Sequence, residues 1–223
     1  MDSVFTAQEQ LIIDKTIEFV KEELSGAEGG HDWWHIQRVW NLADTIAKVE
    51  KADRFVVQLG ALLHDIADSK FHDGDEETGP RKAREFLESL SVEESIIGHI
   101  EQIVANISFK VGRENQVFHS LELDLIQDAD RLDAIGAIGI ARAFNYGGFK
   151  NREIYNPDIL PRPEMSKEAY RKNNSPTINH FYEKLLKLKD LMNTVTGKKL
   201  ALKRHEFMEH FLAEFYQEWE GRC

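Results

Sequence analysis

The sequence is poor in cysteine and proline. Cys223 is the single cysteine among 223 residues, so no disulfide can form within the chain. This excludes a small domain stabilised by disulfide bonds and favours a reducing compartment, so we expect a cytoplasmic protein. Only five residues are proline and 42% are hydrophobic, which is typical of a globular chain rather than a disordered one.

Basic residues are also in deficit, since 28 Lys and Arg oppose 39 Asp and Glu and leave a net charge of -11. That balance argues against broad attraction to nucleic acid or to anionic membrane surfaces. No hydrophobic run approaches the roughly 20 residues that span a bilayer, and the N-terminus lacks the pattern of a secretory signal. We therefore expect neither a nucleic-acid partner nor a membrane partner.

Helical periodicity is what the sequence has in abundance. Apolar residues at spacings of three and four predict an all-α fold without strands. The expected helices cover about residues 11–24, 32–47, 54–66, 121–144, 177–194 and 200–219, with another opened by a capping box at residues 91–94. Loops are expected at residues 69–79 and 146–176, and the second of these holds four of the five prolines.

The length of the chain predicts one domain spanning residues 1–223. Its core is expected at about residues 10–150. An irregular segment and the C-terminal helices are expected at about residues 151–223.

The helix predicted at residues 54–66 is apolar on most sides, yet it ends in His64 and Asp65. Ionisable groups at the edge of a core are costly unless they are paired, and metal ligation is one way to pair them. Imidazole and carboxylate ligands together suit Mn, Fe, Zn, Co or Ni. Because adjacent helical residues point about 100° apart, further ligands have to come from other helices. Asp68 lies one turn after His64 and is a candidate to handle a proton.

Three runs of sequence contain histidine and aspartate in a recognisable order. They are GHDWWHIQRVW at residues 30–40, LLHDIAD at 62–68 and QDADRLDAIGAIGIARAF at 127–144. Spacing alone leaves His31 and His35 open as the first ligand, and Asp128, Asp130 and Asp133 open as the last.

The order of His, then His-Asp, then Asp resembles the HD superfamily of metal-dependent phosphohydrolases, and the runs resemble its YpgQ/YedJ-like bacterial branch. The resemblance implies an HD-domain helical bundle with additional C-terminal helices. It also implies that His35, His64, Asp65 and Asp130 bind one divalent metal ion. Manganese is favoured, with Mg, Fe, Co, Ni and Zn as alternatives. His99 and His119 keep a dinuclear centre open.

The function implied by the resemblance is hydrolysis of a nucleotide, specifically of a (deoxy)nucleoside triphosphate to monophosphate and pyrophosphate. We assign Asp68 and Asp65 catalytic roles. Candidate substrate-binding residues are His31, Lys70, Lys110 and Lys184. The protein is expected to be a monomer or homodimer.

Other functions stay open at this point. They are a phosphatase for nucleoside monophosphates, a non-catalytic HD module that senses metal or nucleotide, and a dinuclear iron oxygenase.

Overall fold

The computed structural model describes residues 5–25, 32–66, 77–107, 118–162, 164 and 174–222 of the protein. Within these ranges the regular secondary structure is entirely helical, which confirms the predicted all-α class. None of the helices described there is both long and apolar enough to cross a bilayer. The chain forms two compact units, Met1–Ala129 and Asp130–Cys223.

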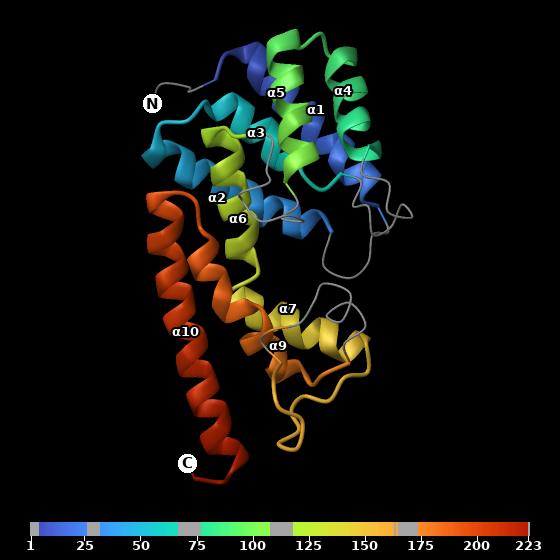
Figure 1. The fold of residues 1–223 in the computed structure, drawn as a ribbon. Coiled ribbons are helices and arrows are strands. Elements are labelled where there is room, and N and C mark those ends of the chain that lie inside the picture. Colours follow the sequence, from blue (N-terminus) through green and yellow to red (C-terminus); the bar gives the residue numbers. More distant parts are fainter. Residues whose placement is uncertain are drawn as a thin grey trace. The chain divides into compact units, whose positions relative to one another are not determined.

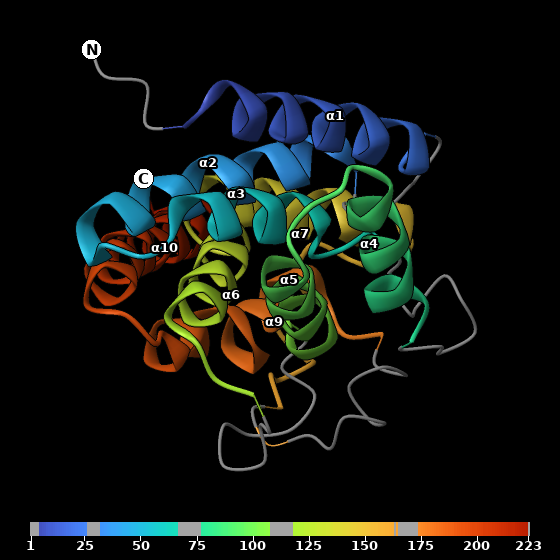
Figure 2. The same ribbon diagram turned by 90° about the horizontal axis from the view of Figure 1, so that it is seen from above.

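The first unit is built around one buried helix, α3. Its helices are α1 (Ala7–Glu23), α2 (Trp33–Glu50), α3 (Arg54–Leu63), α4 (Thr78–Ser89), α5 (Glu94–Asn106) and the first part of α6 (Leu121–Asp133) (Figure 1). Helix α3 packs against α1, α2 and α5, and α4 packs against α5 (Figure 2). Every residue of α3 after its first is buried. This helix is therefore the centre of the unit's core.

Side-chain caps explain where these helices begin. Thr6 and Glu9 form a reciprocal capping box at the start of α1, with Glu9 N–H donating to Thr6 Oγ1 over 3.2 Å. The carboxylate of Asp32 accepts from His35 N–H at the start of α2, and that of Asp53 accepts from Phe55 N–H at the start of α3. Each cap satisfies an N–H group that the helix itself leaves without an acceptor.

Two expectations about α4 and α5 are wrong. Helix α4 was not predicted, and it begins at Thr78, inside the segment expected to be a loop. The predicted capping box at Ser91 does not form, since Glu93 is the N-cap of α5 and makes no side-chain cap. Ser91 instead has a φ of 56°, and its N–H donates to Glu88 O over 2.9 Å. Ser91 therefore closes the preceding helix rather than opening the next one.

The second unit contains the end of α6 followed by α7 (Gly136–Phe149), α9 (Thr177–Glu183), the 3-10 helix η2 (Leu185–Leu191) and α10 (Val195–Trp219). Helix α10 packs against α7 and η2, while α9 packs against α7 and η2. The C-terminal helices expected from the sequence are thus present. The sequence, however, misplaced several of their boundaries.

The predicted helix 121–144 is two helices that separate before Gly136. Gly136 has a φ of +75°, and a Cβ added there would lie 2.9 Å from the Cγ of Arg204. Both the backbone conformation and the close approach require glycine. The predicted helix 177–194 likewise divides at Lys184. Helix α10 begins before residue 200, because Thr194 Oγ1 caps it by accepting from Gly197 N–H.

Candidate metal centre

Three of the four predicted ligands lie together. One potential ligand atom from each of His35, His64 and Asp130 lies within 4.8 Å of the others. Both histidines are buried and Asp130 is half-buried. The boundary between the two units falls directly before Asp130, but α6 is continuous across it. Two nitrogen atoms and one carboxylate oxygen form a donor set suited to a first-row divalent metal.

His64 is already oriented as a metal-binding imidazole would be. It follows the last residue of α3, and its Nδ1 lies 2.8 Å from the carbonyl oxygen of Ala61. A carbonyl can only accept, so Nδ1 carries the hydrogen and Nε2 carries the lone pair. Nε2 is buried and has no hydrogen-bond partner among the residues that the structure describes. A metal ion would satisfy this otherwise costly buried nitrogen, while the Nδ1–H bond to a backbone carbonyl fixes the ring.

His35 reaches the same place from the first turn of α2. Its backbone N–H donates to the Asp32 cap over 3.0 Å, which fixes the beginning of the helix that carries it. Its ring faces that of His64 edge-on, with the ring centroids 5.5 Å apart. The two imidazoles therefore converge from separate helices.

The size of the cluster fits one small ion. Metal–nitrogen and metal–oxygen bonds are about 2.0–2.2 Å long, so two ligands of one ion lie at most about 4.4 Å apart. The three ligand atoms of the cluster all lie within 4.8 Å of one another, which is close to this largest separation of two ligands. Small side-chain rotations would close the difference.

Asp65 is the predicted ligand that lies outside this cluster. It is half-buried in the turn after α3. Among the carboxylates of α6 that spacing left open, only Asp130 joins the cluster. Asp133 forms an ion pair with Arg142, and Asp128 is fully buried without belonging to the group.

The two additional histidines do not join the cluster either. His99 Nε2 lies 2.9 Å from Ser120 Oγ and 3.7 Å from Glu122 Oε2, and its ring packs edge-on against Phe118. His119 is exposed. Among the described residues, the cluster of His35, His64 and Asp130 is the one arrangement of this kind.

The predicted proton handler and most predicted substrate-binding residues lie outside the described residues. These are His31, Asp68, Lys70 and Lys110. Lys184 is described and is exposed at the C-terminus of α9. Burial, together with the positive charges of Lys184 and Arg152, lowers the pKa of the neighbouring His180 from 6.5 to about 4. His180 is therefore neutral at physiological pH.

Sequence reasoning overlooked Gln58, which lies 5% exposed among the apolar residues of α3. Its amide bonds to Trp40 and Asp44 of α2, the helix that carries His35. The sequence does contain a signal for a buried polar residue, because Gln58 interrupts a run that is otherwise apolar from Phe55 to Leu63.

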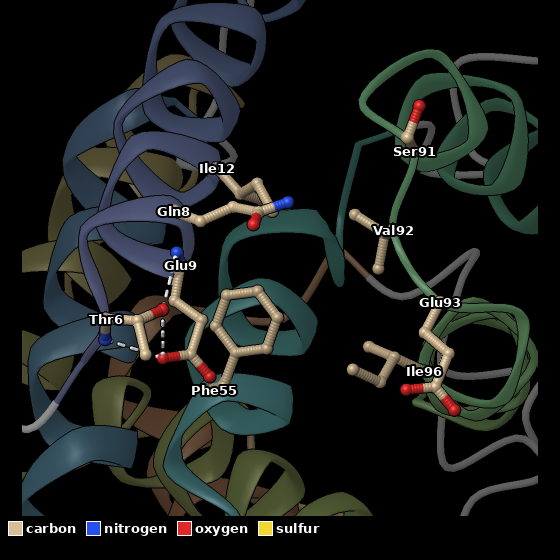
Figure 3. Close-up of a pocket in the computed structure, with 9 residues that line it drawn as sticks. All are labelled: Thr6, Gln8, Glu9, Ile12, Phe55, Ser91, Val92, Glu93 and Ile96. Atoms are coloured by element: carbon tan, nitrogen blue, oxygen red, sulfur yellow. Dashed lines mark hydrogen bonds between the residues drawn. The ribbon is translucent and has the colours of Figure 1, made fainter.

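One depression in the first unit lies apart from these residues and has a volume of about 270 Å³. Figure 3 shows the residues that line it: Thr6, Gln8, Glu9, Ile12, Phe55, Ser91, Val92, Glu93 and Ile96. Its ionisable residues are the two glutamates, and Glu9 is engaged in the cap of α1. This lining offers no cation for a phosphate, and none of the candidate ligands reaches it.

Comparison with known proteins places this arrangement in a family. Residues 33–135, which include all four predicted ligands, match the HD domain family. YpgQ of Bacillus subtilis (strain 168) is 37% identical to the chain over 207 residues, which cover 91% of each protein. The chain belongs to the HD superfamily. The resemblance seen in the sequence, including that to the YpgQ-like branch, is thereby confirmed.

Solved structures of HD proteins agree with this fold over most of their length. An HD-superfamily hydrolase from Bacillus thuringiensis is 46% identical, with a TM-score of 0.78 over 95% of this chain and 98% of that one. B. subtilis YpgQ in complex with ADP is 33% identical, with a TM-score of 0.76 over 95% of this chain and 96% of that one. The likeness covers the HD domain and the helices that follow it.

Proposed function

We propose that this HD-domain protein is a metal-dependent phosphohydrolase that converts a (deoxy)nucleoside triphosphate to monophosphate and pyrophosphate. The observation that carries the proposal is the cluster of His35, His64 and Asp130, in which no described residue forms a hydrogen bond with the buried Nε2 of His64. Two relatives support it. The B. thuringiensis protein is described as a hydrolase, and YpgQ was crystallised with ADP.

The proposed ligands of one divalent ion are His35, His64, Asp65 and Asp130. Two neutral imidazoles and two carboxylates balance the charge of such an ion. When bound, the ion supplies Lewis acidity toward phosphoryl oxygen and toward water. The bond from His64 Nδ1–H to Ala61 O holds the imidazole in the tautomer that this role requires. Manganese is the first metal to test.

The proposed reaction is a displacement at the α-phosphorus. A water oxygen forms a new bond to that phosphorus, and the bond from phosphorus to the α–β bridging oxygen breaks, so that pyrophosphate leaves. Asp68 is the proposed acceptor of the water's proton. Positive charge is needed to hold the phosphates, and Lys70, Lys110 and Lys184 are the candidates, with His31 as a further substrate contact.

The decisive experiment identifies the products. The purified protein with manganese is incubated in ¹⁸O-labelled water with a panel of nucleoside mono-, di- and triphosphates. We expect equal amounts of monophosphate and pyrophosphate from triphosphates, with the label in the monophosphate. Orthophosphate released from monophosphates would indicate a phosphatase instead. Binding without turnover would indicate a sensor, and oxygen consumption with iron would indicate an oxygenase.

A pair of variants separates the two carboxylates that follow α3. Asp65→Asn is expected to lower both metal retention and turnover, because Asp65 is proposed as a ligand. Asp68→Asn is expected to retain the metal and to lower turnover by about 10²–10⁴-fold, as is typical for loss of a general base. If Asp65→Asn retains the metal and full activity, the proposed ligand set is wrong.

A further inference from the structure

Gln58 is a buried polar residue whose two hydrogen bonds both go to α2. Its Oε1 accepts from the indole N–H of Trp40, and its Nε2 donates to Asp44 Oδ1 over 2.8 Å. Burying an amide is costly unless its donor and acceptor are both satisfied. The amide is therefore stable only where α2 presents an indole donor and a carboxylate acceptor together.

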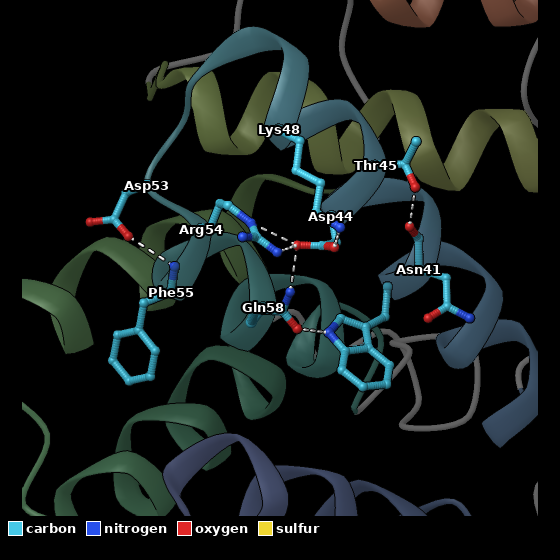
Figure 4. Close-up of polar contacts among 9 residues, drawn as sticks. Asn41, Asp44, Thr45, Lys48, Asp53, Arg54, Phe55 and Gln58 are labelled. Carbon is cyan, nitrogen blue, oxygen red and sulfur yellow. Dashed lines mark hydrogen bonds and ion pairs between the residues drawn. The ribbon is translucent and has the colours of Figure 1, made fainter. Parts of the chain in front are cut away.

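Asp44 is itself held in place by cations. Arg54, the first residue of α3, donates to Asp44 Oδ1 from Nε over 2.9 Å and from Nη2 over 2.6 Å. Lys48 lies 2.7 Å from the other carboxylate oxygen. Figure 4 shows Arg54 and Gln58 converging on this carboxylate from α3. We call Trp40, Asp44, Arg54 and Gln58 the α2–α3 clamp.

The clamp and the two histidines belong to the same antiparallel helix pair. Three residues connect α2 to α3, so the helices run in opposite directions. Trp40 lies five residues after His35 on α2, and Gln58 lies six residues before His64. The contact between Trp40 and Gln58 and the contact between His35 and His64 are thus successive contacts along one interface.

Sliding one helix along the other would separate the histidines. A shift of one residue moves a helix by about 1.5 Å, a large fraction of a metal–ligand bond of about 2.0–2.2 Å. Apolar contacts between helices can repack after such a shift. The bonds of Gln58 cannot, because they are directional and each needs its partner in one position. A single buried polar residue is known to fix helix register in this way.

We propose that Gln58 is a positioning residue that fixes the register of α2 against α3 and thereby the spacing of the imidazoles of His35 and His64. The inference rests on the proposed function only in taking these two histidines to be metal ligands. Gln58 itself does not touch the metal or the substrate. Its effect is exerted through the helix pair.

The test measures binding of cobalt(II) to the intact protein by titration and by its visible absorption spectrum. Gln58→Leu removes both amide bonds at similar volume. We expect it to weaken cobalt binding by about 10-fold or more, in the range seen when contacts that orient metal ligands are lost, and to alter the spectrum. Leu87→Ala on α4 is the control, because it opens a fully buried site away from α2. It should leave both cobalt readouts unchanged.

A charge swap provides the rescue. In the double variant Asp44→Asn/Gln58→Glu, the new carboxylate can accept from Trp40 and from the new amide. The two bonds between residue 58 and α2 are thereby restored with exchanged polarity, while Arg54 loses its ionised partner at residue 44. Cobalt affinity and spectrum should return close to those of the unmodified protein, whereas Gln58→Glu alone places two carboxylates together and should not bind well. If Gln58→Leu does not fold, Trp40→Phe takes its place. This variant changes a half-buried side chain and removes one of the two bonds of Gln58, so it should also weaken cobalt binding.

Different results would contradict the metal centre and the positioning role of Gln58. If the unmodified protein binds cobalt and Gln58→Leu binds it with the same affinity and spectrum, the positioning role is wrong and the metal centre stands. A swap that recovers stability without recovering cobalt binding would also overturn the positioning role. If the unmodified protein binds no cobalt, the metal centre itself is wrong and the inference falls with it.

Discussion

The helix pairs α2–α3 and α4–α5 of the first unit are each joined by a polar network, and the two networks differ in how far their side chains are exposed to water. In α2–α3 the side chains of Arg54 and Asp44 are 19% and 18% exposed, and their ion pair continues into the buried amide of Gln58. In α4–α5, the side chain of Arg84 is 29% exposed and meets three glutamates whose side chains are 29%, 52% and 72% exposed.

Ion pairs exposed to water contribute little to stability. Apolar packing therefore holds α4 against α5, and the network around Arg84 adds little. Directional bonds inside the α2–α3 interface restrict how that pair can fit together. The restricted pair is the one that carries His35 and His64, as the positioning role proposed for Gln58 requires.

Removing a histidine from each pair should give the largest difference. His64→Ala is expected to weaken manganese or cobalt binding by at least about 100-fold, since loss of a ligand exceeds the 10–100-fold typical of losing an outer contact. His99→Ala on α5 should leave binding unchanged, because His99 contacts Ser120 rather than the cluster. Metal titration of both variants checks this. An equal loss in His99→Ala would favour a dinuclear centre.

Adding a methyl group to a glycine in each pair should change stability in opposite directions. A Cβ at Gly60 on α3 would lie 2.9 Å from the Cδ1 of the buried Ile126, so Gly60→Ala should lower the free energy of unfolding by roughly 1–3 kcal/mol. A Cβ at Gly98 on α5 meets nothing within 4 Å, so Gly98→Ala should raise it by roughly 0.5–1 kcal/mol. Urea unfolding measures both. A gain in stability at Gly60 would show that the α3–α6 contact is looser than described.

Neutralising one carboxylate in each network should have the smallest effect. Burial alone would raise the pKa of Asp44, but hydrogen bonds and charges from Lys48 and Arg54 outweigh it and lower the pKa below its ordinary value of 3.8. The ionised carboxylate therefore stabilises the fold above about pH 4, and this contribution is lost as the pH falls through the lowered pKa. Asp44→Asn should cost about 1 kcal/mol near neutral pH, and the difference should shrink below pH 4.

The matched variant in the other network is Glu94→Gln, which removes the most exposed partner of Arg84. Its effect on the unfolding midpoint should be smaller than that of Asp44→Asn and should vanish at high salt, because exposed charges are screened. Urea unfolding at neutral and acidic pH, with and without added salt, compares the two. Equal costs would mean that burial does not distinguish the networks.

The sequence predicted local features well where a local pattern controls them. The period of apolar residues identified α1, α2, α3 and α10 as helices, because each helix buries one face or more. Boundaries failed where distant residues decide them. At Gly136 the distant side chain of Arg204 leaves no room for a Cβ, which the local pattern does not reveal. Ser91 is a different case, because its bond to Glu88 O is local and closes α4 where a capping box was expected.

By itself, the sequence determined that this is an all-α protein of the HD type, and it marked His64 as a candidate metal ligand because this imidazole ends an apolar helix. It left Asp128, Asp130 and Asp133 equivalent by spacing. Only the tertiary structure brought Asp130 to the two histidines and paired Asp133 with Arg142. Only the tertiary structure showed that Gln58 bonds to α2. Helical periodicity is local, whereas the partners of a buried polar group are set by helices that meet across the fold.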